Sequence, residues 1–164
     1  MRLRVAEHDY ELYLSKPFET REARGAAMQL TNFTDYSLRV LLYAASQGER
    51  RITIEETANI YGISRAHLMK VVNQLTASGF LTAVRGRSGG VVLARPPEKI
   101  RLGDVVRATE PDFAMVECFR EENHCAITPR CKLRGVLHEA KSDFLATLDR
   151  YTLADIALKS RDFL

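Results

Sequence analysis

The sequence predicts a mainly α-helical protein with a small β wing: a winged helix-turn-helix domain followed by a long dimerisation helix. Three observations predict this fold class. Two short amphipathic segments within residues 53–78 are joined by a glycine, a glycine-rich stretch with β-prone flanks follows at residues 80–94, and apolar residues recur at helical spacing over residues 132–151. Two short helices followed directly by a hairpin are typical of a winged helix.

The first helix of this fold is predicted to begin near Thr34 and to end near Gly48. Threonine is a favourable N-cap, and glycine commonly ends a helix. Between these two positions, apolar residues recur every three or four residues, at Leu38, Leu41, Leu42 and Ala45. We therefore expect an amphipathic helix ahead of the helix-turn-helix pair.

The helix-turn-helix pair is predicted from its caps. Thr53 and Glu56 fit a capping box, which opens a short helix that ends near Tyr61. Gly62 then permits a tight turn, and Ser64 caps a second helix.

The second helix of the pair divides into an apolar and a polar face. Its apolar stripe consists of Leu68, Val71, Val72 and Leu75. The remaining positions offer donors and acceptors suited to phosphates and base edges in a major groove. An amphipathic surface helix without a nucleic-acid ligand would show the same stripe, so the helix alone leaves both interpretations open. The candidate DNA contacts on it are Ser64, Arg65, His67, Lys70, Asn73 and Gln74.

A basic hairpin is predicted directly after this helix. The β-prone runs Phe80–Arg85 and Val91–Ala94 flank the stretch GRSGG, which suits a hairpin tip. Arg85 and Arg87 bring positive charge to that tip, where a wing lies along phosphates or enters the minor groove. Residues 65–101 carry seven basic residues and one acidic residue, on a chain whose net charge is +3. This order and charge favour DNA binding over a merely solvated face.

A short helix and a loop that contains every cysteine come next. The segment IRLGDVVRATEP predicts a helix ended by Pro111, and the thiols follow at Cys118, Cys125 and Cys131. Their spacing lacks paired C-x-x-C knuckles, so an ordinary structural zinc site fits poorly. An iron–sulfur cluster held by three thiolates and one other group fits the pattern. A zinc site that also uses His124, and a thiol switch that closes a disulfide on oxidation, remain as alternatives.

The last long element is an amphipathic helix predicted from about Lys132 to Tyr151. A helix of this kind outside the DNA-binding unit most simply packs against its copy in a dimer, because helix-turn-helix proteins usually read two half-sites. Packing back on its own domain is the alternative. The apolar residues of the helix are Leu133, Leu137, Ala140, Phe144, Leu148 and Tyr151.

We divide the chain into an N-terminal extension at 1–27, a winged helix-turn-helix DNA-binding domain at 28–110, a cysteine loop at 111–131, and a dimerisation helix with a C-terminal segment at 132–164. No apolar run approaches the length of a membrane span, and the first residues lack the apolar centre of a secretory signal. With an odd cysteine count, we expect a cytoplasmic protein with no membrane partner. Motifs such as G-x-S-x-G and H-E-x-x-H are absent, and we expect no enzyme activity.

About four-fifths of the chain, from Met28 to about Leu158, resembles the NsrR group of nitric-oxide-responsive repressors. This group belongs to the winged-helix iron–sulfur regulator family, which also includes IscR. Stretches beyond the generic winged helix carry the resemblance, because LTNFTDY, ITPRCKL and YTLADI are specific to this group. The matching motifs are MQLTNFTDYSLRVLLYAA, YGISRAHLMKVVNQL, TAVRGRSGGVVL, IRLGDVVRATEP, CAITPRCKL and LDRYTLADI.

The resemblance implies more than the residues do. It implies a cytoplasmic homodimer that binds a near-palindromic operator in double-stranded DNA and carries a 4Fe–4S or 2Fe–2S cluster on the three cysteines. It also implies that Asp35, from the partner subunit, is a candidate fourth ligand, and that nitric oxide is the signal that relieves repression. Within the same family, an IscR-like regulator that senses iron or cluster supply is the alternative. The match places the usual family start at Met28, so residues 1–27 depart from the pattern.

Overall fold

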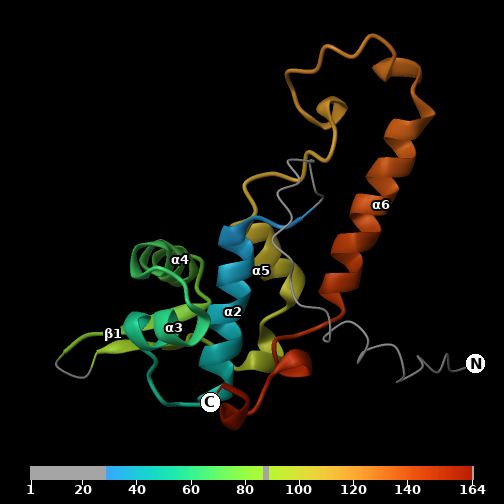
Figure 1. The fold of residues 1–164 in the computed structure, drawn as a ribbon. Coiled ribbons are helices and arrows are strands. Elements are labelled where there is room, and N and C mark those ends of the chain that lie inside the picture. The colour runs from blue at the N-terminus through green and yellow to red at the C-terminus, as the bar shows by residue number, and fades with distance from the viewer. Residues whose placement is uncertain (1–28, 87–88, 164) are drawn as a thin grey trace, which may run out of the picture.

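The computed structural model describes residues 29–86 and 89–163, so the predicted N-terminal extension and Arg87 lie outside the described residues. Helix α2 (Asn32–Ser46) stands in the middle of the domain. In Figure 1, α3, α4 and a β-hairpin lie on one side of α2 and α5, and α6 lies on the other. The loop between α5 and α6 extends beyond the rest of the domain (Figure 1).

Helix α2 begins three residues earlier than the sequence predicts. Its N-cap is Thr31, whose hydroxyl oxygen accepts a hydrogen bond from the Thr34 backbone N–H at 3.3 Å. The prediction of Thr34 as the cap is therefore wrong: that residue is fully buried in the first turn. Two threonines three residues apart offer the same local signal, and burial decides between them. The predicted end is confirmed, because α2 stops at Ser46 and Gly48 adopts φ 60°.

The helix-turn-helix pair forms as predicted. Helix α3 (Ile54–Tyr61) opens with the Thr53–Glu56 capping box and ends at Gly62, which has φ 63°. This left-handed conformation carries little steric cost for glycine alone, and it sets the turn into the second helix. Helix α4 (Arg65–Ala77) is capped by the Ser64 hydroxyl. Its predicted apolar stripe is buried in full, at Leu68, Val71, Val72 and Leu75.

The predicted wing is a two-stranded antiparallel hairpin. Strand β1 (Leu81–Val84) pairs with β2 (Gly90–Leu93), with Leu81 opposite Leu93 and Val84 opposite Gly90. The segment before α3 joins the same sheet, because the Ile52 N–H donates to the Val91 carbonyl at 3.0 Å and the reverse bond measures 2.9 Å. The wing is therefore attached at its base to the segment that leads into α3.

Substitution of Gly90 tests this attachment. An alanine Cβ at position 90 would lie 2.6 Å from the Ile52 carbonyl oxygen, so the backbone would have to separate. We expect Gly90→Ala to lower the free energy of unfolding by at least about 1 kcal/mol, because the paired bonds between Ile52 and Val91 are broken. Urea unfolding measures the change.

Gly135 provides the control for that substitution. It lies within α6 (Lys132–Asp149), and no atom would lie within 4 Å of an added Cβ. Alanine there is expected to be neutral or to add about 0.5–1 kcal/mol, because glycine in a helix is entropically unfavourable. Equal stability of Gly90→Ala and the wild type would contradict the attachment of the wing.

Helix α5 (Leu102–Thr109) connects the winged domain to α6. Backbone hydrogen bonds on both sides of Arg101 hold the segment after α6 beside the start of α5: Leu102 N to the Tyr151 carbonyl at 3.0 Å, and Leu153 N to the Ile100 carbonyl at 2.8 Å. The Leu153 side chain is fully buried in the core. The C-terminal end of α6 is therefore fixed to the domain.

The remainder of α6 is exposed or half-buried. No residue of α6 is buried, and the exposed fractions are 61% for Leu133, 60% for Val136 and 44% for Phe144. Packing of the helix on its own chain is therefore concentrated near α5, with a further contact where the Phe119 ring meets His138 at a centroid distance of 6.1 Å. Within the described part of the chain, no helix combines the length and the hydropathy that a membrane span requires.

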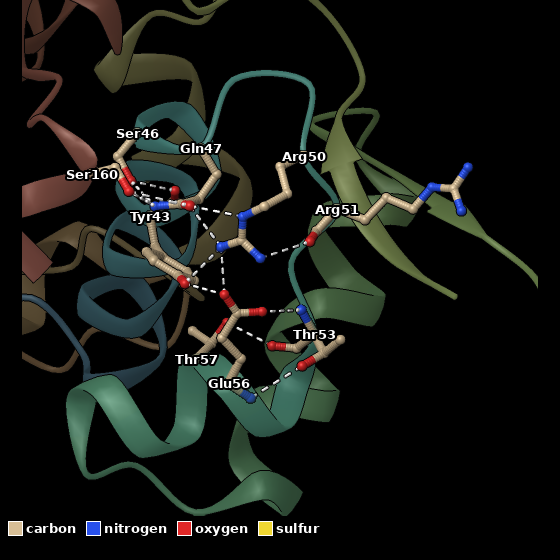
Figure 2. Close-up of polar contacts among 9 residues, drawn as sticks. All are labelled: Tyr43, Ser46, Gln47, Arg50, Arg51, Thr53, Glu56, Thr57 and Ser160. Atoms are coloured by element: carbon tan, nitrogen blue, oxygen red, sulfur yellow. Dashed lines mark hydrogen bonds and ion pairs between the residues drawn. The ribbon is translucent and has the colours of Figure 1, made fainter. Parts of the chain in front are cut away.

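The C-terminal segment Ser160–Phe163 returns to α2. The Gln47 side-chain amide donates to the Ser160 hydroxyl at 3.0 Å (Figure 2). The Phe163 ring packs edge-to-face on Tyr43 and Tyr61, with centroid distances of 5.3 and 6.1 Å. This segment therefore covers the corner where α2 and α3 meet.

Candidate nucleic-acid interface and cysteine loop

Helix α4 presents a polar surface to solvent beside the wing. Every described candidate DNA contact is exposed: Ser64, Arg65, His67, Lys70, Asn73, Gln74 and Arg85. The buried stripe fixes this orientation, because side chains on the opposite side of the helix must face outward. The predicted contact at Arg87 lies outside the described residues.

The candidate contacts differ in how firmly the protein itself holds them. Arg65 reaches Glu55 of α3 at 3.7 Å, and the His67 ring lies 6.5 Å from the Tyr36 ring of α2. By contrast, the Lys70 and Asn73 side chains form no hydrogen bond or ion pair with any other residue that the structure describes. On α4, these two side chains are therefore available to a ligand without breaking a contact to another described residue.

A polar network links α3 to α2 and to the segment between them (Figure 2). The Glu56 carboxylate accepts hydrogen bonds from the Tyr43 hydroxyl, the Arg50 guanidinium and the Thr53 N–H. The pKa of Glu56 lies below its ordinary value of 4.5, mainly because its carboxylate accepts a hydrogen bond from the Arg50 guanidinium. Sequence alone indicated only the capping box between Thr53 and Glu56; Tyr43 and Arg50 enter through the tertiary fold.

This network predicts a pH dependence of stability. The pKa of Glu56 is lower in the folded chain, so its contribution is fully present above pH 4.5 and is lost as the pH falls through the folded-state pKa. We expect Glu56→Gln to lower the free energy of unfolding more at pH 7 than at pH 3. Urea unfolding at both pH values measures the difference.

Glu55→Gln is the matched control for Glu56→Gln. The Glu55 side chain is 66% exposed, and its only ion pair with a described residue is the 3.7 Å contact to Arg65. An exposed pair of this kind contributes little, so its substitution is expected to leave the pH dependence unchanged. Identical pH profiles for the two variants would contradict the role of the network.

The cysteine loop has little structure that would fix its thiols in place. None of residues 111–131 is buried, and all three cysteines are free, with Cys125 exposed and Cys118 and Cys131 half-buried. Short-range hydrogen bonds shape the middle of the loop, where the side-chain Oδ1 of Asn123 accepts from Cys125 N at 3.0 Å and from the Thr128 hydroxyl at 3.2 Å.

The loop supplies donors suited to an iron–sulfur cluster, because thiolate is the preferred ligand of such clusters. Its conformation in the single chain does not gather them: among the described residues, no three of His, Cys, Asp or Glu stand close enough to hold a metal ion. The chemistry of the donor set therefore fits a cluster, and assembly would require the loop to rearrange.

Asp35 lies in the first turn of α2. In the single chain it does not join a cluster of three His, Cys, Asp or Glu side chains among the described residues. Its carboxylate forms an ion pair with Arg39 at 2.8 Å and is 42% exposed. The Arg39 guanidinium also lies 6.0 Å from the Tyr36 ring centroid and 5.9 Å from that of Tyr61. Burial raises the pKa of Tyr61 to about 12, so its hydroxyl stays protonated and donates to the Arg39 carbonyl.

Two contacts from the C-terminal end of α5 have no signal in the sequence. Arg107 forms two hydrogen bonds of 2.6 Å with the Asp149 carboxylate at the end of α6. Glu110 accepts a hydrogen bond from the N-cap residue Thr31 of α2, N to Oε1, at 2.7 Å. These partners are 42 and 79 residues apart, so no local pattern could pair them.

A helix-turn-helix with a solvent-facing second helix and an adjoining hairpin wing defines the winged-helix class of transcriptional regulators. Within that class, this chain belongs to the Rrf2 family. The model of this family, described as an iron-dependent transcriptional regulator, matches residues 30–159.

Solved structures agree with this assignment. A Listeria innocua protein described as a transcriptional regulator is 28% identical, with TM-score 0.66, over 80% of this chain and 88% of the other. CymR, the global cysteine regulator of B. subtilis, is 26% identical, with TM-score 0.65, over 80% and 97%. IscR of T. potens is 25% identical, with TM-score 0.64, over 79% and 86%. The predicted fold class is thereby confirmed.

Proposed function

We propose that this chain is a homodimeric repressor that binds operator DNA and responds to nitric oxide through an iron–sulfur cluster. The observation that carries the proposal is the position of the thiols. All three stand on the one loop that joins α5, which is packed on the DNA-binding domain, to α6, where Leu133, Val136 and Phe144 are exposed. A ligand that gathers the thiols therefore acts between the reading helices and the proposed dimer helix.

In this proposal each part of the chain has a separate task. Lys70 of α4 and Arg85 beside it contact phosphate, and Asn73 of α4 reads base edges in the major groove. The exposed apolar residues of α6 pair with the partner subunit. Cys118, Cys125 and Cys131 hold a 4Fe–4S or 2Fe–2S cluster, with Asp35 of the partner subunit as fourth ligand. Bound there, the cluster supplies iron, which is the site of attack for nitric oxide.

In this proposal, the conformation of the cysteine loop controls the affinity of the dimer for operator DNA. With its thiols gathered, the loop constrains the end of α5 and the start of α6, and so the orientation of the two reading helices across the dimer. Released thiols remove this constraint, and affinity for two half-sites about one helical turn apart falls. Repression of genes for nitric-oxide detoxification in the cytoplasm would then be relieved.

A direct test begins with anaerobic purification, a visible absorption spectrum and assays of iron, sulfide and zinc. Operator fragments are selected from a random duplex library, and binding is measured during a nitric oxide titration. We expect iron and sulfide in the protein and a loss of operator binding as nitric oxide is added. Stoichiometric zinc without iron would contradict the cluster.

A second candidate is a regulator that senses iron or cluster supply, and the 25% identity to T. potens IscR favours it. The same titration distinguishes the two. If operator binding by the cluster-bound protein does not change when nitric oxide is added, nitric oxide is excluded as the signal. If the apo protein also binds the operator with a different affinity, the second candidate is supported.

The DNA contact of Lys70 gives a separate prediction. Lys70→Ala is expected to weaken binding to all sequences alike and to reduce the slope of log affinity against log salt by about 0.9 for each phosphate that the lysine would neutralise. Fluorescence anisotropy at several salt concentrations measures both. Lys159→Ala removes the same charge outside α4 and the wing and is expected to change neither. A Lys70→Ala variant with the wild-type slope would exclude the phosphate contact.

A further inference from the structure

The exposed side chains of α4 differ in what they contact. His67 and Gln74 are seven residues apart, which is two helical turns, so they lie on the same side of the helix. On that side His67 contacts Tyr36 of α2, and Gln74 contacts α5. Lys70 lies between them on the helix surface and Asn73 lies further around, and neither has a partner among the described residues. Thus His67 and Gln74 reach the neighbouring helices at the edge of the exposed surface, whereas Lys70 and Asn73 meet solvent alone.

The amide of Gln74 is fully occupied as a donor. Its Nε2 donates to the Ala108 carbonyl of α5 at 3.3 Å and to the Ser78 hydroxyl at 3.4 Å. A glutamine that reads adenine must donate to N7 while its own oxygen accepts from N6. The side-chain amide has only two N–H donors, so this reading would break at least one internal bond. Gln74 is therefore poorly placed as a base contact.

The acceptor of Gln74 stands next to the residue that holds α6. Ala108 follows Arg107, whose guanidinium forms the paired 2.6 Å bonds to Asp149. The pair lies directly over Gly103, where an added Cβ would be 2.0 Å from the Asp149 carboxylate oxygen. Gln74 thus links the reading helix to the part of α5 that is fixed to the end of α6.

We propose that Gln74 is a positioning residue: through Ala108 and the Arg107–Asp149 pair, it sets the orientation of α4 relative to α6. This inference rests on the proposed function, in which two copies of α6 pair and two copies of α4 read half-sites. Gln74 then controls the separation of the two reading helices and leaves the choice of bases to Asn73.

The test uses full-length Gln74→Met, which keeps the length of the side chain and removes both donors. Affinity is measured for the selected operator, for its single base-pair variants, and for versions with one base pair added or removed between the half-sites. We expect about fivefold weaker binding to the selected operator, which corresponds to the loss of the one hydrogen bond between α4 and α5; the bond to Ser78 does not link the two helices. The ranking of base-pair variants stays unchanged, and the preference for the original spacing weakens.

Arg107→Gln provides an independent variant on the α6 side of the same connection. It is expected to reproduce the weakened spacing preference, and the double variant should bind no more weakly than about the weaker single variant, because both changes break one connection. Asn73→Ala, in contrast, should change the ranking of base-pair variants and keep the spacing preference. Urea unfolding confirms that each variant is folded.

A changed preference at one base pair in Gln74→Met, with wild-type spacing preference, would overturn the assignment and make Gln74 a base contact. Wild-type behaviour of Gln74→Met in both measurements overturns it as well. These outcomes differ from failure of the proposed function, in which the wild-type protein itself selects no duplex from the library.

Discussion

Replacing Leu153 with alanine is expected to lower the free energy of unfolding by about 2–5 kcal/mol. The Leu153 side chain is fully buried, and it enters the core just after α6 ends. The substitution removes apolar packing and leaves a cavity in a close-packed region. Because the 2.8 Å bond from Leu153 N to the Ile100 carbonyl lies beside that cavity, we also expect the end of α6 to separate more easily from the domain.

Leu158→Ala is the matched control for this substitution. Leu158 lies five positions further along the same segment, and 46% of it is exposed. Its truncation is expected to change the free energy of unfolding by less than about 0.5 kcal/mol, as is usual for surface positions. Urea unfolding of both variants gives the comparison. Similar destabilisation by the two would mean that the C-terminal segment does not enter the core as described.

Replacing Cys125 with serine is expected to remove most of the iron and sulfide from anaerobically purified protein, since a neutral hydroxyl is a poor substitute for a thiolate ligand. Operator affinity should fall about ten- to hundredfold, the range of a typical coupling between two sites. Because Cys125 is exposed, the free energy of unfolding of the apo protein should change by less than about 0.5 kcal/mol. Loss of DNA binding would then reflect the missing ligand and not unfolding.

His124→Ala separates the cluster from a zinc site. His124 is the exposed neighbour of Cys125, and its backbone N–H donates to Glu117, so removing the imidazole leaves that bond intact. We expect His124→Ala to keep the iron content and nitric oxide response of the wild type. Parallel loss of metal from both variants, with zinc as the metal in the wild type, would support a histidine-containing zinc site.

Much of the fold could be predicted because its signals are local. The capping box at Thr53, the left-handed turn at Gly62 and the buried stripe of α4 depend on residues within a few positions of each other. The hairpin follows from two β-prone runs around a glycine-rich tip, and the two strands pair antiparallel. Local chemistry thus determined the helix-turn-helix, the wing and the outward face of α4.

The polar contacts between elements could not be predicted in this way. Thr31 and not Thr34 caps α2, because tertiary packing buries Thr34. Gln74 resembles a DNA contact in sequence, yet its amide meets the Ala108 carbonyl of a helix 34 residues further along. A one-dimensional pattern gives the face on which a side chain lies, but it does not give the element that covers that face.

The sequence by itself determined that this protein is a winged helix with three thiols between its DNA-binding unit and a long amphipathic helix. Only the tertiary structure decided that α5 fixes α6 through Arg107 and Asp149, that Leu153 returns to the core, and that the thiols stay apart in the single chain. The physical reason is the separation along the chain between the residues that interact. Helix caps, turns and apolar periodicity act over a few residues, whereas these contacts depend on which surfaces the folded chain brings together.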